Sequence, residues 1–235
     1  MRAFFQVTLR TVDVNAARRF YAALLGGGAL DVVELHEQAR SRGAPPHWLP
    51  FLEVDEVGLA AEAFIARGAQ ALGPRWVSAA GLEAAVLRDP GGAVLALARP
   101  PPGAPRAAAP GVAWYGLVTA DVERAQERYE ALFGWAFEPP RALGALGVFR
   151  PFAWERGGPQ VGALTDVASH PGAHPHWLVH FRVGSLAEGL EQVMRAGGAA
   201  QGPFATPSGD LVAVCEDPQG AAFALQEQAP GPPTG

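Results

Sequence analysis

The chain contains one ordered set of motifs twice, and this repeat constrains its fold more than any other feature of the sequence. Three segments return in the same order: RRFYAALLG (18–26) as ERYEALFG (127–134), PHWLPFLEV (46–54) as PHWLVHFRV (175–183), and LRDPGGAVLAL (87–97) as CEDPQGAAFAL (215–225). Three matches in one order predict two homologous domains in tandem.

The two copies differ in length at one place. Asp13 and Asp121 stand 108 residues apart, whereas His47 and His176 stand 129 apart, so the first copy lacks 21 residues between Gly26 and His47. Two short strands and their turn have about this length. The first domain is therefore expected to have lost most of one hairpin.

Proline marks the boundary between the copies. The segment 99–111 is rich in proline, which blocks helix interiors and central strands, so it predicts a semi-rigid linker. The Pro- and Gly-rich end of the chain predicts a flexible tail. The expected domains are residues 1–99 and 112–228, with the linker at 100–111 and the tail at 229–235.

The second copy displays the elements of the expected fold. Residues 112–119 alternate as a strand does, and Asp121 caps a helix that Gly134 ends. Further strands are expected at 135–139, 147–154 and 160–166, after which the order of strand, helix and hairpin begins again at 177. Each copy is thus predicted to be α+β, a pair of βαβββ modules with curved, mixed, mainly antiparallel sheets.

Charge and composition exclude several classes of function. A net charge of −5 and a pI of 5.7 argue against a nucleic-acid partner, which usually requires a basic patch. All 18 basic residues are arginine, which removes the lysine of Schiff-base enzymes and phosphate-binding loops. The single cysteine, Cys215, allows no internal disulfide, and no apolar run is long enough for a membrane helix. We therefore expect a cytoplasmic protein with no membrane partner.

The repeated motifs also carry a resemblance to a known family. Both copies open with T-x-D-x-x-x-A-x-x-(F/Y)-Y-x-x-L-x-G, at 11–26 and, with Arg128 before Tyr129, at 119–134. PHWL precedes each middle strand, and D-P-x-G closes each copy. In these features, over about residues 3–228, the chain resembles the vicinal oxygen chelate superfamily of glyoxalases, bleomycin resistance proteins and extradiol dioxygenases. It looks most like tandem two-domain glyoxalase-like members, and the resemblance implies their fold.

The resemblance implies metal ligands on the first, fifth and eighth strands of a domain. Strand alternation puts these positions at Val7, Leu49 and Ala96 in the first copy and at Tyr115, Leu178 and Ala224 in the second. A one-residue shift gives Gln6, Trp48 and Leu97, and Trp114, Trp177 and Leu225. Apart from Gln6, none of these is a usual ligand for a divalent ion. We therefore expect no metal site and no other cofactor.

The same alternation predicts which side chains line the cup of each sheet. The second cup is expected to hold Tyr115, Leu117, Leu178, His180, Arg182 and Gln226, and the first to hold Phe51 and Glu53. His180 would exchange a proton near neutral pH, and Arg182 would hold an anionic oxygen. If the protein is an enzyme, His180, Arg182 and Tyr115 are the expected catalytic residues. The alternative is that His180 is a core histidine and Arg182 a strand-end charge that reaches water.

Three other sets of residues favour structural roles. Glu34 and His36 alternate at a predicted strand end and are interpreted as solvated. His170, His174 and His176 form a dense histidine tract, yet His47 repeats His176, which favours a structural entry to the strand. Cys215 is interpreted as a small buried hydrophobic residue.

Three hypotheses of function follow. The first is a metal-independent binding protein that sequesters a small planar or aromatic molecule, as resistance proteins of the resembled superfamily do. The second is a metal-independent lyase, isomerase or cyclase, with an oxygenase disfavoured because the implied metal ligands are absent. The third is a degenerate paralogue with a structural or interaction role. A homodimer is compatible with all three.

Overall fold

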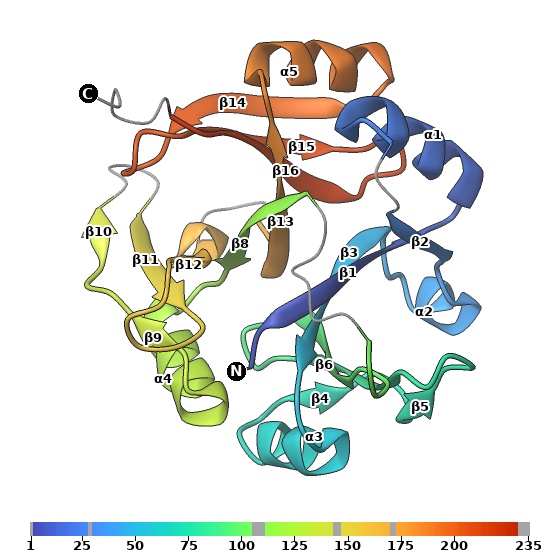
Figure 1. Ribbon diagram of the computed structural model, residues 1–235, viewed down its shortest axis with the longest axis vertical. Helices are drawn as coiled ribbons and strands as arrows, with labels where there is room; N and C mark the ends of the chain where they lie inside the picture. The colour runs from blue at the N-terminus through green and yellow to red at the C-terminus, as the bar shows by residue number, and fades with distance from the viewer. Residues whose placement is uncertain (1, 28–29, 105–110, 143–146, 170–172, 230–235) are drawn as a thin grey trace. The chain divides into compact units, whose positions relative to one another are not determined.

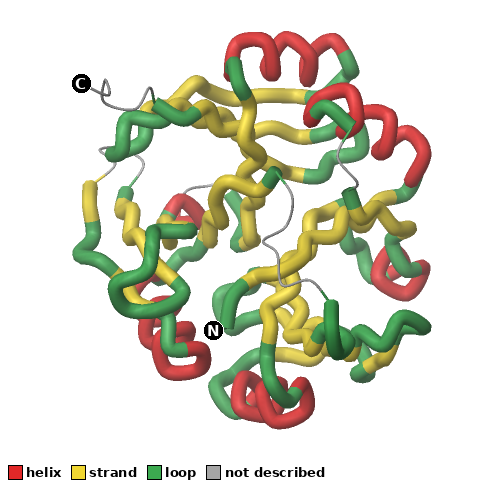
Figure 2. Tube along the Cα trace, in the orientation of Figure 1, coloured by secondary structure: helices red, strands yellow, loops and turns green. Residues whose placement is uncertain are grey.

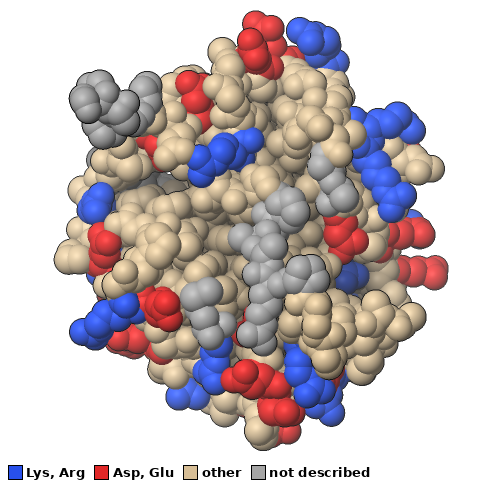
Figure 3. All heavy atoms as spheres, in the orientation of Figure 1, with Lys and Arg blue, Asp and Glu red and all other residues tan. Residues whose placement is uncertain are grey.

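The computed structural model describes residues 2–27, 30–104, 111–142, 147–169 and 173–229 of the chain (Figure 1). Residues 105–110 of the predicted linker and 230–235 of the predicted tail lie outside the described residues. None of the described helices is both long and apolar enough to cross a membrane. On the face that Figure 3 shows, acidic and arginine side chains of the described residues are interspersed and form no basic patch.

The first half of the chain forms one mixed sheet with three helices. Its elements are β1 (Phe4–Thr11), α1 (Val14–Leu25), β2 (Asp31–Glu34), α2 (Glu37–Ser41), β3 (His47–Glu53), α3 (Val57–Ile65), β4 (Gln70–Ala71), β5 (Trp76–Val77), β6 (Glu83–Arg88) and β7 (Val94–Arg99). The strand order is β2-β1-β3-β7-β6-β4, and β5 also pairs with β6. The pairs β1–β2 and β3–β7 are parallel, whereas β6 forms an antiparallel hairpin with β7.

The second half forms a larger sheet of the same design. Its elements are β8 (Val112–Val118), α4 (Val122–Phe133), β9 (Ala136–Phe137), β10 (Arg141–Ala142), β11 (Val148–Ala153), β12 (Gly162–Thr165), the 3₁₀ helix η2 (Val167–Ser169), β13 (His176–Val183), α5 (Leu186–Arg195), β14 (Ala199–Ala205), β15 (Leu211–Glu216) and β16 (Ala222–Glu227). The order is β10-β11-β12-β8-β13-β16-β15-β14, with β9 paired to β11. The pairs β8–β12 and β13–β16 are parallel. The predicted α+β class is confirmed.

The shortened module lies where the spacing of the motifs predicts it. Within the described residues, β2 is the strand between α1 and β3, whereas β9, β10, β11 and β12 lie between α4 and β13. Both α1 and α4 begin at an aspartate whose side chain accepts a hydrogen bond from the helix: Asp13 from Ala16 N at 2.8 Å and Asp121 from Arg124 N at 3.0 Å. Both end at a glycine with φ near 74°, a left-handed conformation that favours glycine.

The chain forms two compact units, and each contains segments from both halves. The first compact unit consists of Met1–Val7, Leu49–Ala109 and Trp114–Leu178, and the second of Thr8–Trp48, Pro110–Ala113 and Val179–Gly235. In the first unit α3 packs against α4, and in the second α1 packs against α5. Each sheet contains strands of one half of the chain, whereas each compact unit combines segments of both halves. The domain bounds 1–99 and 112–228 stay a prediction.

The repeated motifs meet inside these units. In the second compact unit, the hydroxyl of Tyr21 on α1 donates to Asp217 Oδ2 at 3.2 Å and accepts a hydrogen bond from Trp48 Nε1 at 3.2 Å. Asp217 belongs to the D-P-x-G turn of the other half, and its Oδ1 accepts from Ala221 N at 3.0 Å. All three side chains of this chain of contacts are buried. Tyr21 of the first copy thus fixes the D-P-x-G turn of the second copy through its hydrogen bond to Asp217.

The first compact unit repeats this arrangement with the halves exchanged. The hydroxyl of Tyr129 on α4 donates to Asp89 Oδ2 at 3.0 Å, and Asp89 Oδ1 accepts from Ala93 N at 2.9 Å. Burial raises the pKa of Asp89, and it raises the pKa of Tyr129 well above its usual value. Buried polar groups need such partners, which explains why the Tyr and D-P-x-G motifs occur together in both copies.

Candidate functional site

In the second compact unit, helix α5 covers one face of the strands β14, β15 and β16 (Figure 2). On that face, Glu227 Oε2 accepts from Leu186 N of α5 at 2.6 Å. Alternate residues of a strand point to opposite faces, so Gln226 lies on the face opposite α5. Strand β13 pairs with β16 in the register Arg182↔Gln226 and His180↔Ala224, which puts His180 and Arg182 on that same face.

A chain of hydrogen bonds joins three polar side chains on this face. The carboxylate of Asp210 accepts from Gln226 Nε2, with 2.8 Å between Asp210 Oδ2 and the amide nitrogen. The amide oxygen of Gln226 lies 3.2 Å from Nδ1 of His180. Because an amide oxygen only accepts hydrogen bonds, the proton of this contact belongs to His180 Nδ1. We call these three residues the His180 relay.

The ring of His180 is neutral at physiological pH. Burial lowers its pKa to about 4, although the hydrogen bond to Gln226 acts in the opposite direction. A neutral imidazole carries one proton, and here that proton lies on Nδ1. The other nitrogen, Nε2, is therefore unprotonated, and within the described part of the chain no hydrogen bond to it is found, so its lone pair can accept a hydrogen bond or take a proton from a bound molecule.

Arg182 lies near the end of β13 and behaves as a strand-end charge. Its side chain is exposed, and one of its guanidinium nitrogens donates to the amide oxygen of Gln228. It shares the face of His180, but its charge reaches water. The structure therefore places Arg182 at the margin of the face and not in an apolar pocket beside His180.

Tyr115 and Leu117 do not lie on the predicted face, so this part of the site prediction is wrong. Tyr115 belongs to the first compact unit, where its ring lies 4.8 Å from that of Phe4, and Phe4 lies 4.9 Å from Trp177. Trp177 and Leu178 are successive residues of β13 and point to opposite faces, so Tyr115 lies on the face opposite Leu178. Leu117, two residues further on β8, shares the face of Tyr115 and is fully buried.

The prediction from the sequence assigned the side chains of β8 to the two faces of the sheet with a shift of one residue. Trp114, which the shifted register names, stacks with Phe149 on the other face, with 6.3 Å between the ring centroids and 5° between the planes. Tyr115 is 6% exposed, and within the described residues its buried hydroxyl has no hydrogen-bond partner. Burial raises its pKa further above the usual range. These surroundings are those of a core residue.

The corresponding face of the first copy is filled by its own side chains. Phe51, the counterpart of His180, is 2% exposed and packs in an apolar cluster. The cluster consists of Leu49, Phe51, Ala84, Ala96 and Ala98, with Phe5, Trp76, Leu82, Val86 and Val94 packed against it. Glu53 lies at the end of β3 and is partly buried, and its backbone N–H donates to Ala3 O at 2.9 Å.

A cavity of about 350 Å³ lies beside this cluster in the first compact unit. Phe5, Gln6, Ser78 and Leu82 line it together with the first prolines after β7. None of its lining residues carries a charge or an imidazole. The cavity therefore offers polar contacts through Gln6 and Ser78 but no group for acid–base chemistry.

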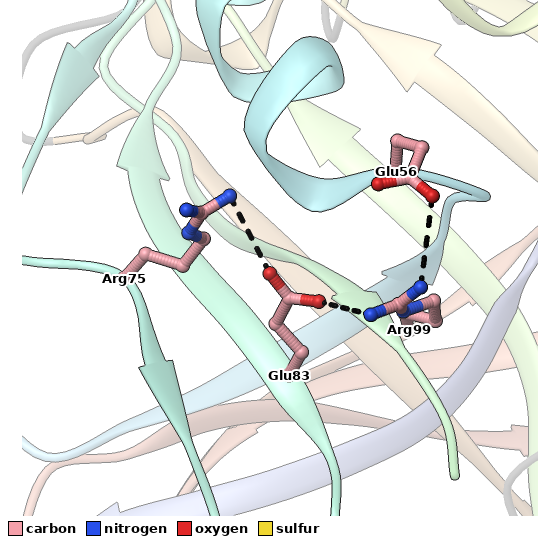
Figure 4. A network of polar contacts seen from close by, with 4 residues as sticks. All are labelled: Glu56, Arg75, Glu83 and Arg99. Carbon is pink, nitrogen blue, oxygen red and sulfur yellow. Dashed lines mark hydrogen bonds and ion pairs between the residues drawn. The ribbon is translucent and has the colours of Figure 1, made fainter.

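The charged cluster of the first compact unit is a balanced ion-pair network (Figure 4). Glu83 lies between Arg75 and Arg99, at 3.5 and 2.8 Å, and Arg99 also pairs with Glu56 at 3.6 Å. Two carboxylates and two guanidinium groups compensate each other. The network joins β6 and β7 to the start of α3 and leaves no net charge for a ligand.

Three other histidines of the described residues, His36, His47 and His176, have structural side-chain contacts. Nδ1 of His47 lies 2.8 Å from Pro45 O, and Nδ1 of His176 lies 2.7 Å from His174 O, so both rings fasten the turn before a strand. His36 lies beyond β2 and caps α2 by accepting from Gln38 N at 3.2 Å, so it does not alternate with Glu34 on a strand. His170 lies outside the described residues. Cys215 is buried on β15.

Comparison with known proteins places this fold in a family. The profile of the Glyoxalase/Bleomycin resistance protein/Dioxygenase superfamily matches residues 3–141, and that of the Glyoxalase-like domain matches residues 115–226. Matches of this extent define the class: the chain belongs to the glyoxalase/bleomycin resistance protein/dioxygenase superfamily.

Two relatives extend along most of the chain. One is the protein named "Putative glyoxylase CFP32" of Mycobacterium tuberculosis, which is 28% identical over 249 residues, covering 95% of this chain and 94% of the relative. The other is "Anthracycline biosynthesis protein DnrV" of Streptomyces peucetius, which is 31% identical over 199 residues, covering 81% of this chain and 69% of the relative.

Solved structures share the fold at low sequence identity. Homoprotocatechuate 2,3-dioxygenase of Brevibacterium fuscum, in complex with 3,4-dihydroxyphenylacetate, superposes with a TM-score of 0.65 at 16% identity, covering 98% of this chain and 82% of that one. The Mn(II)-bound glyoxalase of Novosphingobium aromaticivorans gives 0.60 at 14% identity, covering 97% and 83%. At these identities the likeness concerns the fold alone.

The side chains at the implied positions of the second copy do not fit the divalent metal ion that the family implies. Leu178 and Ala224 hold the implied positions on β13 and β16, and neither Trp114 nor Tyr115 on β8 supplies a ligand. Within the described part of the chain, no three His, Cys, Asp or Glu side chains group closely enough to hold a metal ion. No step proposed below uses one.

Proposed function

We propose that the protein binds a small, hydroxyl-bearing aromatic molecule without a metal ion, at the face of β13 and β16 opposite α5. The observation that carries this proposal is the His180 relay, in which a neutral imidazole leaves Nε2 unprotonated and, among the described residues, without a hydrogen-bond partner. A free acceptor on a partly buried ring matches the hydroxyl of a ligand, which is a hydrogen-bond donor.

The surroundings of His180 support a flat, apolar ligand. Ala224 pairs with His180 on β16, and Val214 pairs with Ala224 on β15, so small apolar side chains share the face with the relay. Ligand sites are mostly apolar with a few fixed polar groups, which is the composition found here. Arg182 stands at the margin, where it can contact an anionic substituent of the ligand.

One relative supports the aromatic class of ligand. The name of the Streptomyces peucetius protein connects it with anthracyclines, which are hydroxylated polycyclic aromatics, and it is 31% identical to this chain. The chemistry of such a molecule fits His180, because its phenolic hydroxyls are donors and its rings are flat and apolar.

An alternative is a metal-independent lyase or isomerase at the same place. The observation in its favour is again Nε2 of His180, since an unprotonated imidazole nitrogen can act as a general base. In that case His180 removes a proton from a bound hydroxyl or an activated carbon. Gln226 then stabilises the imidazolium, because its amide oxygen still accepts from Nδ1.

The proposal is tested with a matched pair of soluble probes. Alizarin red S carries two adjacent hydroxyls on a sulfonated anthraquinone, and anthraquinone-2-sulfonate carries none. Binding is followed in EDTA by quenching of the fluorescence of the six tryptophans. We expect the hydroxylated probe to bind more tightly, and His180→Ala to weaken its binding about tenfold, the scale of one hydrogen bond to a buried partner.

The control is His174→Ala, which removes an exposed imidazole ring. His176 contacts the backbone oxygen of His174, and this oxygen is kept in the variant. It should leave both dissociation constants unchanged. Equal affinity of the two probes, or wild-type affinity of His180→Ala for the hydroxylated probe, would overturn the proposal and favour the structural role.

A further inference from the structure

We propose that Asp210 and Gln226 are positioning residues that hold His180 in its Nδ1-protonated tautomer, so that Nε2 meets a hydrogen-bond donor of the ligand and excludes an anion from that point. The inference deepens the proposed function and rests on it for its purpose. Its geometry is a property of the ligand-free protein and is testable without a ligand.

The carboxylate of Asp210 decides which way the amide of Gln226 points. With the amide nitrogen toward Asp210 Oδ2, at 2.8 Å, the amide oxygen faces His180. In the reversed orientation, the amide oxygen would face the carboxylate of Asp210, and neither group could donate a hydrogen bond to the other. The amide N–H would then point toward His180 Nδ1. The ring would then keep its proton on Nε2 and present a donor. Asp210 therefore sets the chemical character of a nitrogen that it does not touch.

Asp210 is itself fixed by the backbone around it. It ends the turn between β14 and β15, where Thr206 N donates to Asp210 O at 2.9 Å and Gly209 N donates to Thr206 O at 2.9 Å. Its second carboxylate oxygen accepts from Ala229 N at 2.9 Å, just beyond β16. Both oxygens thus have partners, and the carboxylate cannot turn away from Gln226 without losing one of them.

The repeat supplies an internal comparison. The register Leu211↔Glu227 in the second copy matches Glu83↔Arg99 in the first. Aligned in this way, His180 corresponds to Phe51 and Gln226 to Ala98, which are members of the apolar cluster, and Asp210 corresponds to Leu82, which packs against it. One copy packs these positions as a core, whereas the other connects all three by hydrogen bonds. The three polar residues therefore form one set.

Nitrogen-15 NMR of the histidine rings in the ligand-free protein tests the inference. Long-range proton–nitrogen correlations distinguish a protonated from an unprotonated ring nitrogen. In the wild type we expect His180 to show a protonated Nδ1 and an unprotonated Nε2. In Asp210→Ala, the amide of Gln226 is released, and we expect the signals of His180 to move to a mixture of the two tautomers.

The chain supplies its own controls. His47 and His176 donate from Nδ1 to backbone oxygens, so their tautomers should not change in Asp210→Ala and their signals report an intact fold. If Asp210→Ala does not fold, Gln226→Met removes the amide and keeps the length of the side chain, and should release His180 in the same way. In the Gln226→Met background, Asp210→Ala should have no further effect on the ring, since Asp210 acts through Gln226.

The outcomes separate this inference from the proposed function. An Nε2-protonated His180 in the wild type, or an unchanged tautomer in both Asp210→Ala and Gln226→Met, overturns the inference even if Alizarin red S binds. The expected tautomer change, together with a loss of Alizarin red S binding of about fivefold in Asp210→Ala and none for anthraquinone-2-sulfonate, supports it. Expected tautomers with no effect of His180→Ala on binding overturn the proposed function alone.

Discussion

The two buried tyrosines differ in one contact, and this difference predicts unequal costs for the same substitution. Tyr21 has two side-chain partners, Asp217 and Trp48, each at 3.2 Å. Tyr129 donates to Asp89 at 3.0 Å. The indole N–H of Trp177, the counterpart of Trp48 Nε1, acts on Tyr129 by lowering its pKa, but within the described residues it does not reach hydrogen-bond geometry. The substitutions Tyr21→Phe and Tyr129→Phe each remove one hydroxyl and leave the ring packing intact.

The expected losses follow from the number of partners left unpaired. A hydrogen bond contributes about 1 kcal/mol net, and a buried partner left unpaired costs about 1–3 kcal/mol. Tyr129→Phe leaves one aspartate oxygen without its donor, so we expect a loss of about 1–3 kcal/mol in the free energy of unfolding. Tyr21→Phe also deprives Trp48 Nε1 of its acceptor, so we expect a further loss of about 1 kcal/mol.

Urea unfolding followed by circular dichroism measures both values on the same protein. The reasoning requires both variants to be destabilised and Tyr21→Phe to be the less stable one. Equal losses would show that the indole contact contributes nothing. A loss below about 0.5 kcal/mol in either variant, the size of an ordinary surface change, would show that the Tyr–Asp contact does not stabilise the fold.

Three further outcomes are expected. Gln226→Glu puts a carboxylate against His180 Nδ1, which favours the imidazolium, so an NMR titration should show the pKa of His180 rising from about 4; a fall or no change would contradict the relay. Burial raises the pKa of Asp89 in the folded state above its ordinary 3.8. The folded state therefore keeps this proton to a higher pH than the unfolded state does, and stability falls as the pH rises from the unfolded pKa to the folded pKa. Asp89→Asn should flatten this part of the pH–stability curve, and an unchanged slope would assign it to another group. Phe51→Ala should destabilise by about 3–5 kcal/mol through the cavity it leaves, measured by urea unfolding, and a loss below about 1 kcal/mol would mean that the cluster is not packed.

The sequence was sufficient to predict the modules, because their signals are local. The caps Asp13 and Asp121 and the glycines that end α1 and α4 lie within their own helices, so spacing alone predicts them. The missing hairpin follows from counting residues between motifs. What the pattern does not contain is the partner of each tyrosine, since nothing in the order of motifs says that Tyr21 meets the turn of the other half.

The sequence predicted which side chains of β13 and β16 share a face, and that this face is a ligand site stays a prediction. His180 and Gln226 share a face because β13 and β16 are long and regular, so alternation holds along them. The prediction for Tyr115 failed by one residue. Because β8 carries apolar residues on both faces, the alternation of apolar and polar residues does not show which of its side chains point into the cup. Asp210 was missed because an aspartate after Pro-Ser-Gly is typical of a turn, and its contact with Gln226 crosses a hairpin.

The interleaved composition of the compact units has a consequence for what a fragment of this protein would be. Either half of the chain alone carries one member of each Tyr–Asp pair: Tyr21 and Asp89 in the first half, Tyr129 and Asp217 in the second. A protease that cuts between β7 and β8 would therefore release no autonomous domain. We expect the two cleaved pieces to co-elute in gel filtration, to unfold together, and to be insoluble when each is produced by itself.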